Sequence, residues 1–189
     1  MAISLDLLHH ITDDELVHLS ERNPGYQFER TTQGRLVVSP PGGESGRLSM
    51  EVAGQLHAWN TRIKLGMVFD SSTGFNLPDG SCLSPDASWL RSERWEALSP
   101  ADREGFPPLC PNAVFEVRSP SNTRFELRAK MQTYIENGAQ VAVYIDPKTH
   151  RVEVYRPGQE PDRYEDAPRI SFDPDLPEFF LNLDPIFRR

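Results

Sequence analysis

The chain has few cysteines and no long hydrophobic run, and both absences narrow the class of protein. Only two of its 189 residues are cysteines, and Cys82 and Cys110 lie far apart. A disulfide between them is not required, and a reduced cytoplasmic protein is favoured. No apolar stretch approaches the ~20 residues that span a bilayer. The N-terminus lacks the layout of a secretory signal, so we expect no membrane partner.

Positive charge is also in short supply. The 20 lysines and arginines stand against 28 aspartates and glutamates, which gives a formal net charge of −8. This balance argues against a protein that holds nucleic acid by bulk electrostatics, because that requires clustered cations. A nuclease is not excluded, because carboxylates that bind divalent cations also make a domain acidic. The bound metal then supplies positive charge where phosphate lies.

Several common catalytic motifs are missing. The five histidines show neither HExxH nor another paired spacing, so a zinc site is not predicted. The GxSxG motif of serine hydrolases and the GxxxxGK[ST] phosphate loop are both absent. The candidate catalytic groups are therefore the carboxylates.

The length and the apolar periodicity predict one α/β (or α+β) domain over residues 1–189, with a mixed central sheet flanked by helices. Thr12 and Glu15 form a predicted capping box before a short first helix. A hairpin is expected within 26–39, a long helix over 44–64 and a second core helix over 124–137. Further strands are expected within 66–90, at 112–118, 141–145 and 152–155, and in the tail at 157–189. Residues 91–111 are expected to form a short helix followed by a surface loop.

Two acidic residues occupy unusual places in this pattern. Asp86 lies in a predicted strand, where aspartate is uncommon, and the proline before it indicates an edge or a bulge. Glu116 lies in a strand that reads as buried, and a buried carboxylate must be paired, hydrogen-bonded or bound to metal. Each has a structural alternative: Asp86 capping a local turn, and Glu116 pairing with Arg118 on the same strand face.

Together the two acids indicate a metal site. Two carboxylates on adjacent strands suit Mg²⁺ or Mn²⁺, which bind oxygen ligands and leave room for water and phosphate. Such a metal ion supports hydrolysis of a phosphoester by activating water and offsetting charge on the leaving oxygen. A nearby Lys or Arg would orient the water or stabilise the transition state.

At these residues the sequence resembles a known family. Pro85-Asp86, followed thirty positions later by Glu116-Val117-Arg118, resembles the PD…(D/E)XK pattern of nucleases. The longer run VFEVRSPSNTRFELRAKMQTYIENGAQVAVYIDP is similar to the bacterial Uma-type restriction-endonuclease family. The likeness extends over nearly the whole chain, including SPPGGESG before the long helix. It implies a restriction-endonuclease-like fold and a DNA endonuclease, with Asp86 and Glu116 as metal ligands and the Val117 carbonyl as an additional one.

The sequence departs from the pattern at the lysine. Arg118 stands two residues after Glu116, where lysine is expected, and arginine can hold a phosphate or brace Glu116 but cannot act as a base. In relatives of this kind the lysine moves to the next helix, and Lys130 fits that place, at the edge of the apolar stripe that includes Leu127 and Tyr134. The alternative is that Lys130 extends to solvent.

The resemblance also implies a third acid from the first core helix. Glu44 is the candidate catalytic residue there, although a carboxylate at a helix start is favoured by the helix dipole regardless of function. Glu51 is the second choice, and Gln55 on the same helical edge is a candidate substrate-binding residue.

Three functional hypotheses follow. The first is a Mg²⁺- or Mn²⁺-dependent endonuclease whose substrate is DNA, with a homodimer as a plausible state because cutting both strands usually needs two sites. The second is a non-catalytic nuclease-fold domain that binds a protein or nucleic-acid partner, its acids tied up by Arg118 and Lys130. The third is a hydrolase of a small phosphoester. Convergence of Asp86, Glu116 and Lys130 in an open cleft would favour an enzyme.

Overall fold

The main sheet has six strands in the order β11-β10-β9-β8-β7-β4. The computed structural model describes residues 3–7, 9–40, 42–120 and 122–188. All neighbouring strands are antiparallel except β8 and β9, which are parallel. The strands are β4 (Gly66–Asp70), β7 (Ala87–Arg91), β8 (Ala113–Val117), β9 (Val141–Asp146), β10 (Arg151–Tyr155) and β11 (Asp162–Glu165).

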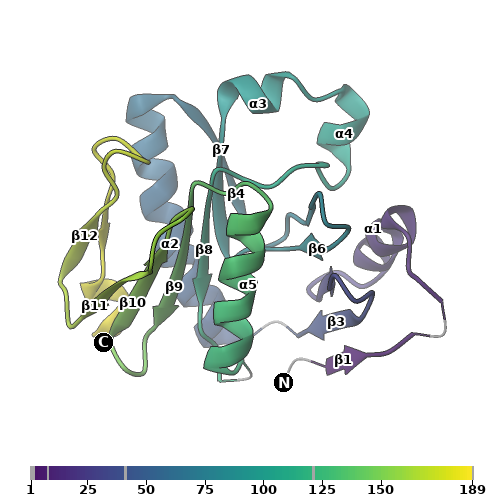
Figure 1. The fold of residues 1–189 in the computed structure, drawn as a ribbon, viewed down its shortest axis with the longest axis horizontal. Helices are drawn as coiled ribbons and strands as arrows, with labels where there is room; N and C mark the ends of the chain where they lie inside the picture. The colour runs from purple at the N-terminus through teal and green to yellow at the C-terminus, as the bar shows by residue number, and fades with distance from the viewer. Residues whose placement is uncertain (1–2, 8, 41, 121, 189) are drawn as a thin grey trace.

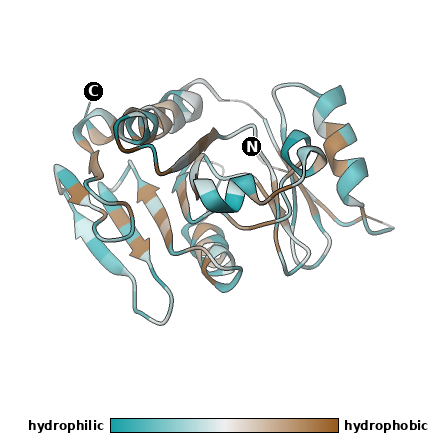
Figure 2. Ribbon diagram, turned by 90° about the horizontal axis from the view of Figure 1, so that it is seen from above, coloured by the Kyte–Doolittle hydropathy of each residue, from teal (hydrophilic) through white to brown (hydrophobic). Residues whose placement is uncertain are grey.

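Two long helices cover the faces of this sheet (Figure 1). Helix α2 (Gly43–Ile63) buries Leu48, Val52, Leu56 and Trp59 against one face. Helix α5 (Arg124–Glu136) buries Leu127, Met131 and Tyr134 against the other. Because β8 and β9 are parallel, the chain must cross over between them, and α5 is that crossover. Figure 2 shows the strands between the two helices, with apolar residues along them. The predicted mixed sheet flanked by helices is confirmed.

A second, smaller sheet lies beside the first and has the strand order β1-β3-β2-β6-β5. It combines the N-terminal segment with a stretch between β4 and β7, and helix α1 (Asp13–Arg22) packs Leu16 into its core. The capping box of Thr12 and Glu15 is present as predicted. The strands are β1 (Ile3–Leu5), β2 (Gln27–Arg30), β3 (Leu36–Ser39), β5 (Phe75–Asn76) and β6 (Cys82–Leu83).

The remaining elements lie between β7 and β8 and at the C-terminus. Residues 91–111 hold two short helices, α3 (Ser92–Glu96) and α4 (Pro100–Glu104), where one was expected. The tail forms the hairpin β12 (Arg169–Ser171) and β13 (Phe180–Asn182) and helix α6 (Asp184–Phe187), whose apolar residues join the core on the α2 side. Within the described ranges, no helix is long and apolar enough to cross a membrane.

Candidate active site

Asp86 lies in a bend immediately before β7 rather than inside a strand. Its Oδ2 accepts a hydrogen bond of 2.7 Å from the backbone N–H of Val117, and its Oδ1 accepts one of 2.9 Å from Ser49 Oγ. Burial raises the pKa of the Asp86 carboxyl, and these two hydrogen bonds act against the rise. Asp86 therefore does not cap a local turn: β8 and α2 hold its carboxylate beside the residue that follows Glu116.

Glu116 lies in β8 with its side chain toward α5, and only 5% of the residue is exposed. Tyr134 Oη donates a hydrogen bond of 3.1 Å to Glu116 Oε1. The predicted alternation along β8 is present, because Phe115 packs on the α2 side while Val114 packs on the α5 side. Glu116 is thus a buried acid whose hydrogen-bond and ion-pair partners come from α5.

Lys130 turns inward from α5 to meet this acid. Its Nζ lies 2.5 Å from Glu116 Oε1 and 2.8 Å from Glu29 Oε1, and 16% of its side chain is exposed. The alternative in which Lys130 extends to solvent is therefore wrong. The predicted convergence on Glu116 is present, although these side chains are mostly buried rather than spread along an open cleft.

Glu29 is a member of the site that sequence reasoning missed. It lies in β2 of the smaller sheet, and its Oε1 also accepts a hydrogen bond of 2.7 Å from the backbone N–H of Ser84. Arg30, the residue after Glu29, pairs with Cys82, so β2 lies next to β6. Ser84 follows Cys82 by two residues and is therefore close to Glu29. A glutamate on the polar face of a hairpin strand was the only sequence signal, and nothing linked it to Asp86.

Two carboxylates, those of Glu116 and Glu29, therefore flank the Lys130 ammonium, and Asp86 adds a third negative charge nearby. Burial raises the pKa of Glu116 to about 8; Lys130 opposes this rise, whereas Asp86 and Glu29 add to it. Burial by itself lowers the pKa of Lys130, but Glu116 and Glu29 outweigh it and the pKa is raised overall. Near neutral pH, Lys130 is consequently a cation that donates hydrogen bonds, while burial favours the protonated form of Glu116. Lys130 is thus suited to stabilising negative charge and not to acting as a base.

The pair Asp86 and Glu116 fits a divalent cation of the Mg²⁺ type. The site has more carboxylate than ammonium charge, and each Asp86 oxygen accepts one hydrogen bond, which leaves lone pairs for a ligand bond. Among the residues that the structure describes, no three Asp, Glu, His or Cys side chains form a ready metal-binding group. A Mg²⁺ ion commonly takes one or two carboxylates together with water and phosphate, so two acids suffice.

Two of the remaining candidate residues have partners outside this cluster. Arg118 does not brace Glu116: its Nη1 lies 3.1 Å from Asp146 Oδ2, because the parallel pairing of β8 with β9 places the ends of both strands together. Gln55 exchanges hydrogen bonds of 3.0 and 2.7 Å with the main chain of Asn182, so the C-terminal hairpin occupies its amide group.

Of the two acids of α2, Glu44 is exposed and Glu51 is partly buried. Glu44 forms an ion pair of 2.9 Å with Arg47, with about half of its side chain exposed. Arg47 also donates to the Pro185 carbonyl. The role of Glu44 stays a prediction, and so do the role of Glu51 and the ligand role of the Val117 carbonyl.

Comparison with known proteins gives the family of the chain and a shared fold. Residues 13–184 match the model of the Uma2 family, described as "Putative restriction endonuclease". The chain belongs to the Uma2 family. Its fold is shared with the crystal structure of a "putative nuclease belonging to DUF820" from Anabaena variabilis, with a TM-score of 0.74 and 20% sequence identity. That match covers 94% of this chain and 97% of the other. A search of curated proteins finds no match.

Membership of the Uma2 family gives the buried cluster a nuclease-like context. The family match includes all four residues of the cluster, Glu29, Asp86, Glu116 and Lys130. The family supports a nuclease-like function in general terms.

Proposed function

We propose that this Uma2-family protein is a Mg²⁺- or Mn²⁺-dependent endonuclease that hydrolyses phosphodiester bonds in DNA. The observation that carries the proposal is the 2.5 Å approach of Lys130 Nζ to Glu116 Oε1, beside an Asp86 that is oriented by Val117. A cation donor and two acids, one just before β7 and one in β8, are groups that suit metal-assisted phosphodiester hydrolysis.

Each residue has a distinct role in this mechanism. Asp86 and Glu116 would hold the metal, which supplies Lewis-acid polarisation of the phosphate and an activated water. Ser49 and the Val117 amide fix the Asp86 carboxylate, so little reorganisation is needed at the moment of reaction. Lys130 would stabilise negative charge on the scissile phosphate or position the water, and Glu29 holds its ammonium in place. Glu44 would assist as a further acid from the start of α2.

One observation favours a second function. Lys130 is paired with two acids inside a largely buried cluster, so its charge is compensated without metal or substrate. The same arrangement would serve a non-catalytic nuclease-fold domain, in which the cluster stabilises the fold and the surface binds a protein or nucleic-acid partner.

A plasmid-nicking assay with Mg²⁺ or Mn²⁺ tests the endonuclease. We expect supercoiled DNA to be nicked by the wild type, and the activity to be lost in Asp86→Asn and Glu116→Gln. Glu160→Gln, in the exposed segment between β10 and β11, is the matched control and should retain activity. Equal nicking by wild type and both site variants would overturn the assignment. An inactive wild type would favour the non-catalytic domain.

We also propose a homodimer as the form that cuts both strands of a duplex, because one copy carries one such cluster. Sedimentation with and without DNA would detect it. A reducing cytoplasm suits the two cysteines, which are both buried and unpaired.

A further inference from the structure

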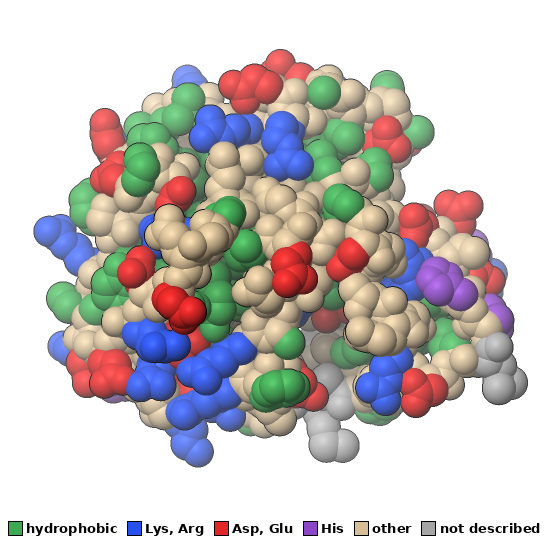
Figure 3. Space-filling model, viewed as in Figure 1, with side chains coloured by type: hydrophobic (Ala, Val, Ile, Leu, Met, Phe, Trp, Pro, Cys, Tyr) green, Lys and Arg blue, Asp and Glu red, His purple; other side chains and the backbone are tan. Residues whose placement is uncertain are grey.

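Basic side chains gather around the N-terminal end of α5, although the chain as a whole carries a net charge of −8. Figure 3 shows them as blue groups along the lower edge of the molecule. Arg118 follows β8, Arg124 and Arg128 lie on α5, and Lys148 lies in the turn after β9. The side chains of the three arginines are 23%, 43% and 42% exposed, respectively.

Two buried acids form ion pairs with these arginines. Arg118 Nη1 and Arg124 Nε each lie 3.1 Å from Asp146 Oδ2, and Arg128 pairs with Glu153. Both acidic side chains are only 1% exposed, whereas the exposed carboxylate of Glu126 in the first turn of α5 accepts hydrogen bonds from Thr123. The four cations Arg118, Arg124, Arg128 and Lys148 exceed the three acids Glu126, Asp146 and Glu153 by one charge. Each guanidinium has five N–H donors, which leaves donors available for phosphate oxygens.

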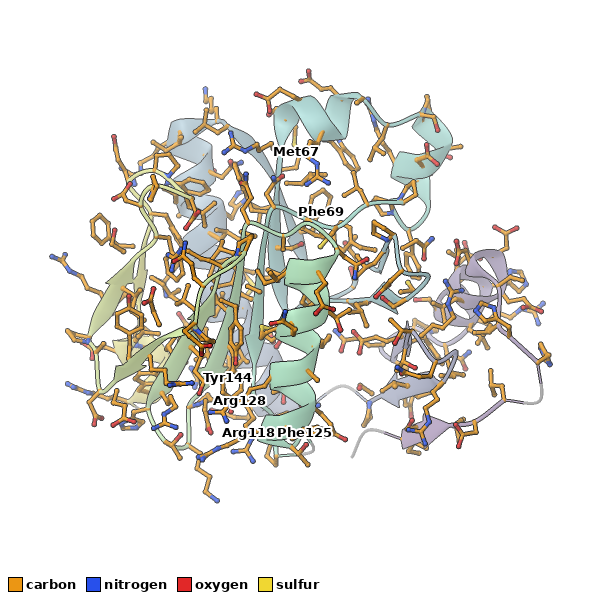
Figure 4. All side chains as sticks on the ribbon, in the orientation of Figure 1. Met67, Phe69, Arg118, Phe125, Arg128 and Tyr144 are labelled. Carbon is orange, nitrogen blue, oxygen red and sulfur yellow. The ribbon has the colours of Figure 1, made fainter. Side chains whose placement is uncertain are left out.

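An exposed aromatic ring lies among these cations. Phe125 is 82% exposed, the largest value among the exposed large hydrophobic side chains of the described chain. It occupies the first turn of α5 between Arg124 and Arg128, and Figure 4 shows Arg118, Phe125 and Arg128 around this end of the helix. Cations that follow a phosphate backbone, together with an aromatic ring on which a base stacks, are typical of surfaces that bind single-stranded nucleic acid.

This surface adjoins the proposed active site. Arg118 follows Glu116 by two residues, or roughly 7 Å along an extended chain. Lys130 belongs to the same helix as Arg124 and Arg128. A DNA strand whose scissile phosphate lies at Glu116 would therefore have neighbouring phosphates within reach of the arginines.

We propose that Arg118, Arg124, Arg128 and Phe125 form the DNA-binding surface of this protein. The arginines contact phosphates that flank the scissile bond, and Phe125 stacks on an accessible base. The preferred substrate is consequently DNA with unpaired bases beside the cut, such as a single strand or an opened duplex. This inference rests on the proposed endonuclease function for the position of the cut, but not for the binding itself.

Fluorescence anisotropy with a labelled single-stranded oligonucleotide and its duplex tests the surface. Glu116→Gln in Mg²⁺ serves as the background, so that the DNA stays intact. Phe125→Ala should weaken binding of the single strand by about 5- to 100-fold and change duplex binding less. Arg124→Gln and Arg128→Gln should each lower the slope of log K against log salt by about 0.7. Met50→Ala, exposed on α2, and Arg169→Gln on β12 are the matched controls and should bind as the background does.

The outcomes separate this surface from the proposed activity. If the arginine variants unfold because Asp146 or Glu153 loses its partner, Phe125→Ala decides, since its exposed ring contributes little to folding. Unchanged binding by Phe125→Ala, equal losses in the controls, or no DNA binding by the background would each overturn the surface. If the wild type nicks DNA but the surface variants bind DNA as the background does, the endonuclease proposal is supported and the binding surface is rejected. Binding that depends on the surface in a chain that never cleaves DNA would support the surface alone.

Discussion

Lys130 Nζ lies 2.5 Å from Glu116 Oε1, although the lysine comes from a helix and the glutamate from the strand before it. The short segment between β8 and α5 reverses the chain direction, and the helix then returns over Glu116. Arg118 follows the end of β8, two residues after Glu116, and its guanidinium turns to Asp146 instead. The ammonium of Lys130 therefore lies inside the cluster, whereas the guanidinium of Arg118 pairs with an acid outside it.

Replacing Lys130 by methionine should lower the rate of plasmid nicking by about 10²- to 10³-fold, because the cation that stabilises the transition state is removed. The rate at saturating Mg²⁺ is the quantity to measure, with a thermal melt to show that the variant is folded. Lys64→Met at the exposed C-terminal end of α2 should nick DNA as the wild type does. A Lys130→Met variant with the rate of the wild type would exclude this role.

Glu116 should make the protein less stable as the pH rises. Its pKa is 4.5 in an ordinary environment and is raised by burial to about 8, so the folded state keeps a proton that the unfolded state has lost. Between these two values the free energy of unfolding should fall with rising pH by up to about 1.4 kcal/mol per unit for this group. Urea unfolding at several pH values measures it. Glu116→Gln should remove this part of the slope, and an unchanged slope would contradict the assignment.

Metal binding near neutral pH should release a proton. A cation that binds the Glu116 carboxylate must displace the proton that burial retains there. Calorimetric titration with Mn²⁺ in two buffers of different ionisation enthalpy gives the number of protons released, which should approach one per site. The release should disappear in Glu116→Gln and persist in Glu160→Gln. Metal binding by wild type without proton release would show that the metal displaces no proton from Glu116 and would overturn this prediction.

Glu29→Gln should lower nicking by about 10- to 100-fold, because the ammonium of Lys130 loses one of the two acids that position it. Glu21→Gln on α1 is a control with an exposed carboxylate. In a Lys130→Met background the Glu29 substitution should have little further effect, because its partner is already gone. Additive losses would mean that Glu29 acts independently of Lys130.

Asp146→Ala should destabilise the fold by about 3 kcal/mol, because Arg118 and Arg124 would lose their shared partner. Burial raises the pKa of Asp146, but Thr149 and the two arginines outweigh it and the pKa is lowered overall. Chemical denaturation compares the variant with Glu160→Ala, whose side chain is exposed. A loss no larger than that of the control would show that the two arginine pairs contribute little to stability.

Local periodicity predicts the main elements of the fold well. Helix α2 was expected over 44–64 and spans Gly43–Ile63, and α5 was expected over 124–137 and spans Arg124–Glu136. The alternation along β8 also places Glu116 on the correct face. In each case the signal lies within one element, where spacing decides which side chains are buried.

Contacts between distant segments were harder to predict. Glu29 reaches the cluster because β2 pairs with β6, and a single-sequence pattern does not specify which strands become neighbours. Gln55 was placed near the site because it follows the edge of the α2 stripe, but the C-terminal hairpin lies there. The strands and the helix of the tail are all short, so its docking position could not be derived from periodicity.

Because Lys130 points inward from α5, the packing of the hydrophobic core sets the position of its ammonium group relative to Glu116. For a lysine two residues after Glu116, the strand backbone would fix the distance between the ammonium group and the carboxylate. For Lys130, that distance depends on how α5 packs against the sheet. Met131, the next residue, is completely buried in that contact, together with Leu127. Substitutions in this apolar layer would shift the ammonium relative to Glu116 without touching a charged group. Apolar substitutions in the core can therefore change the geometry of the proposed site without replacing any of its charged residues.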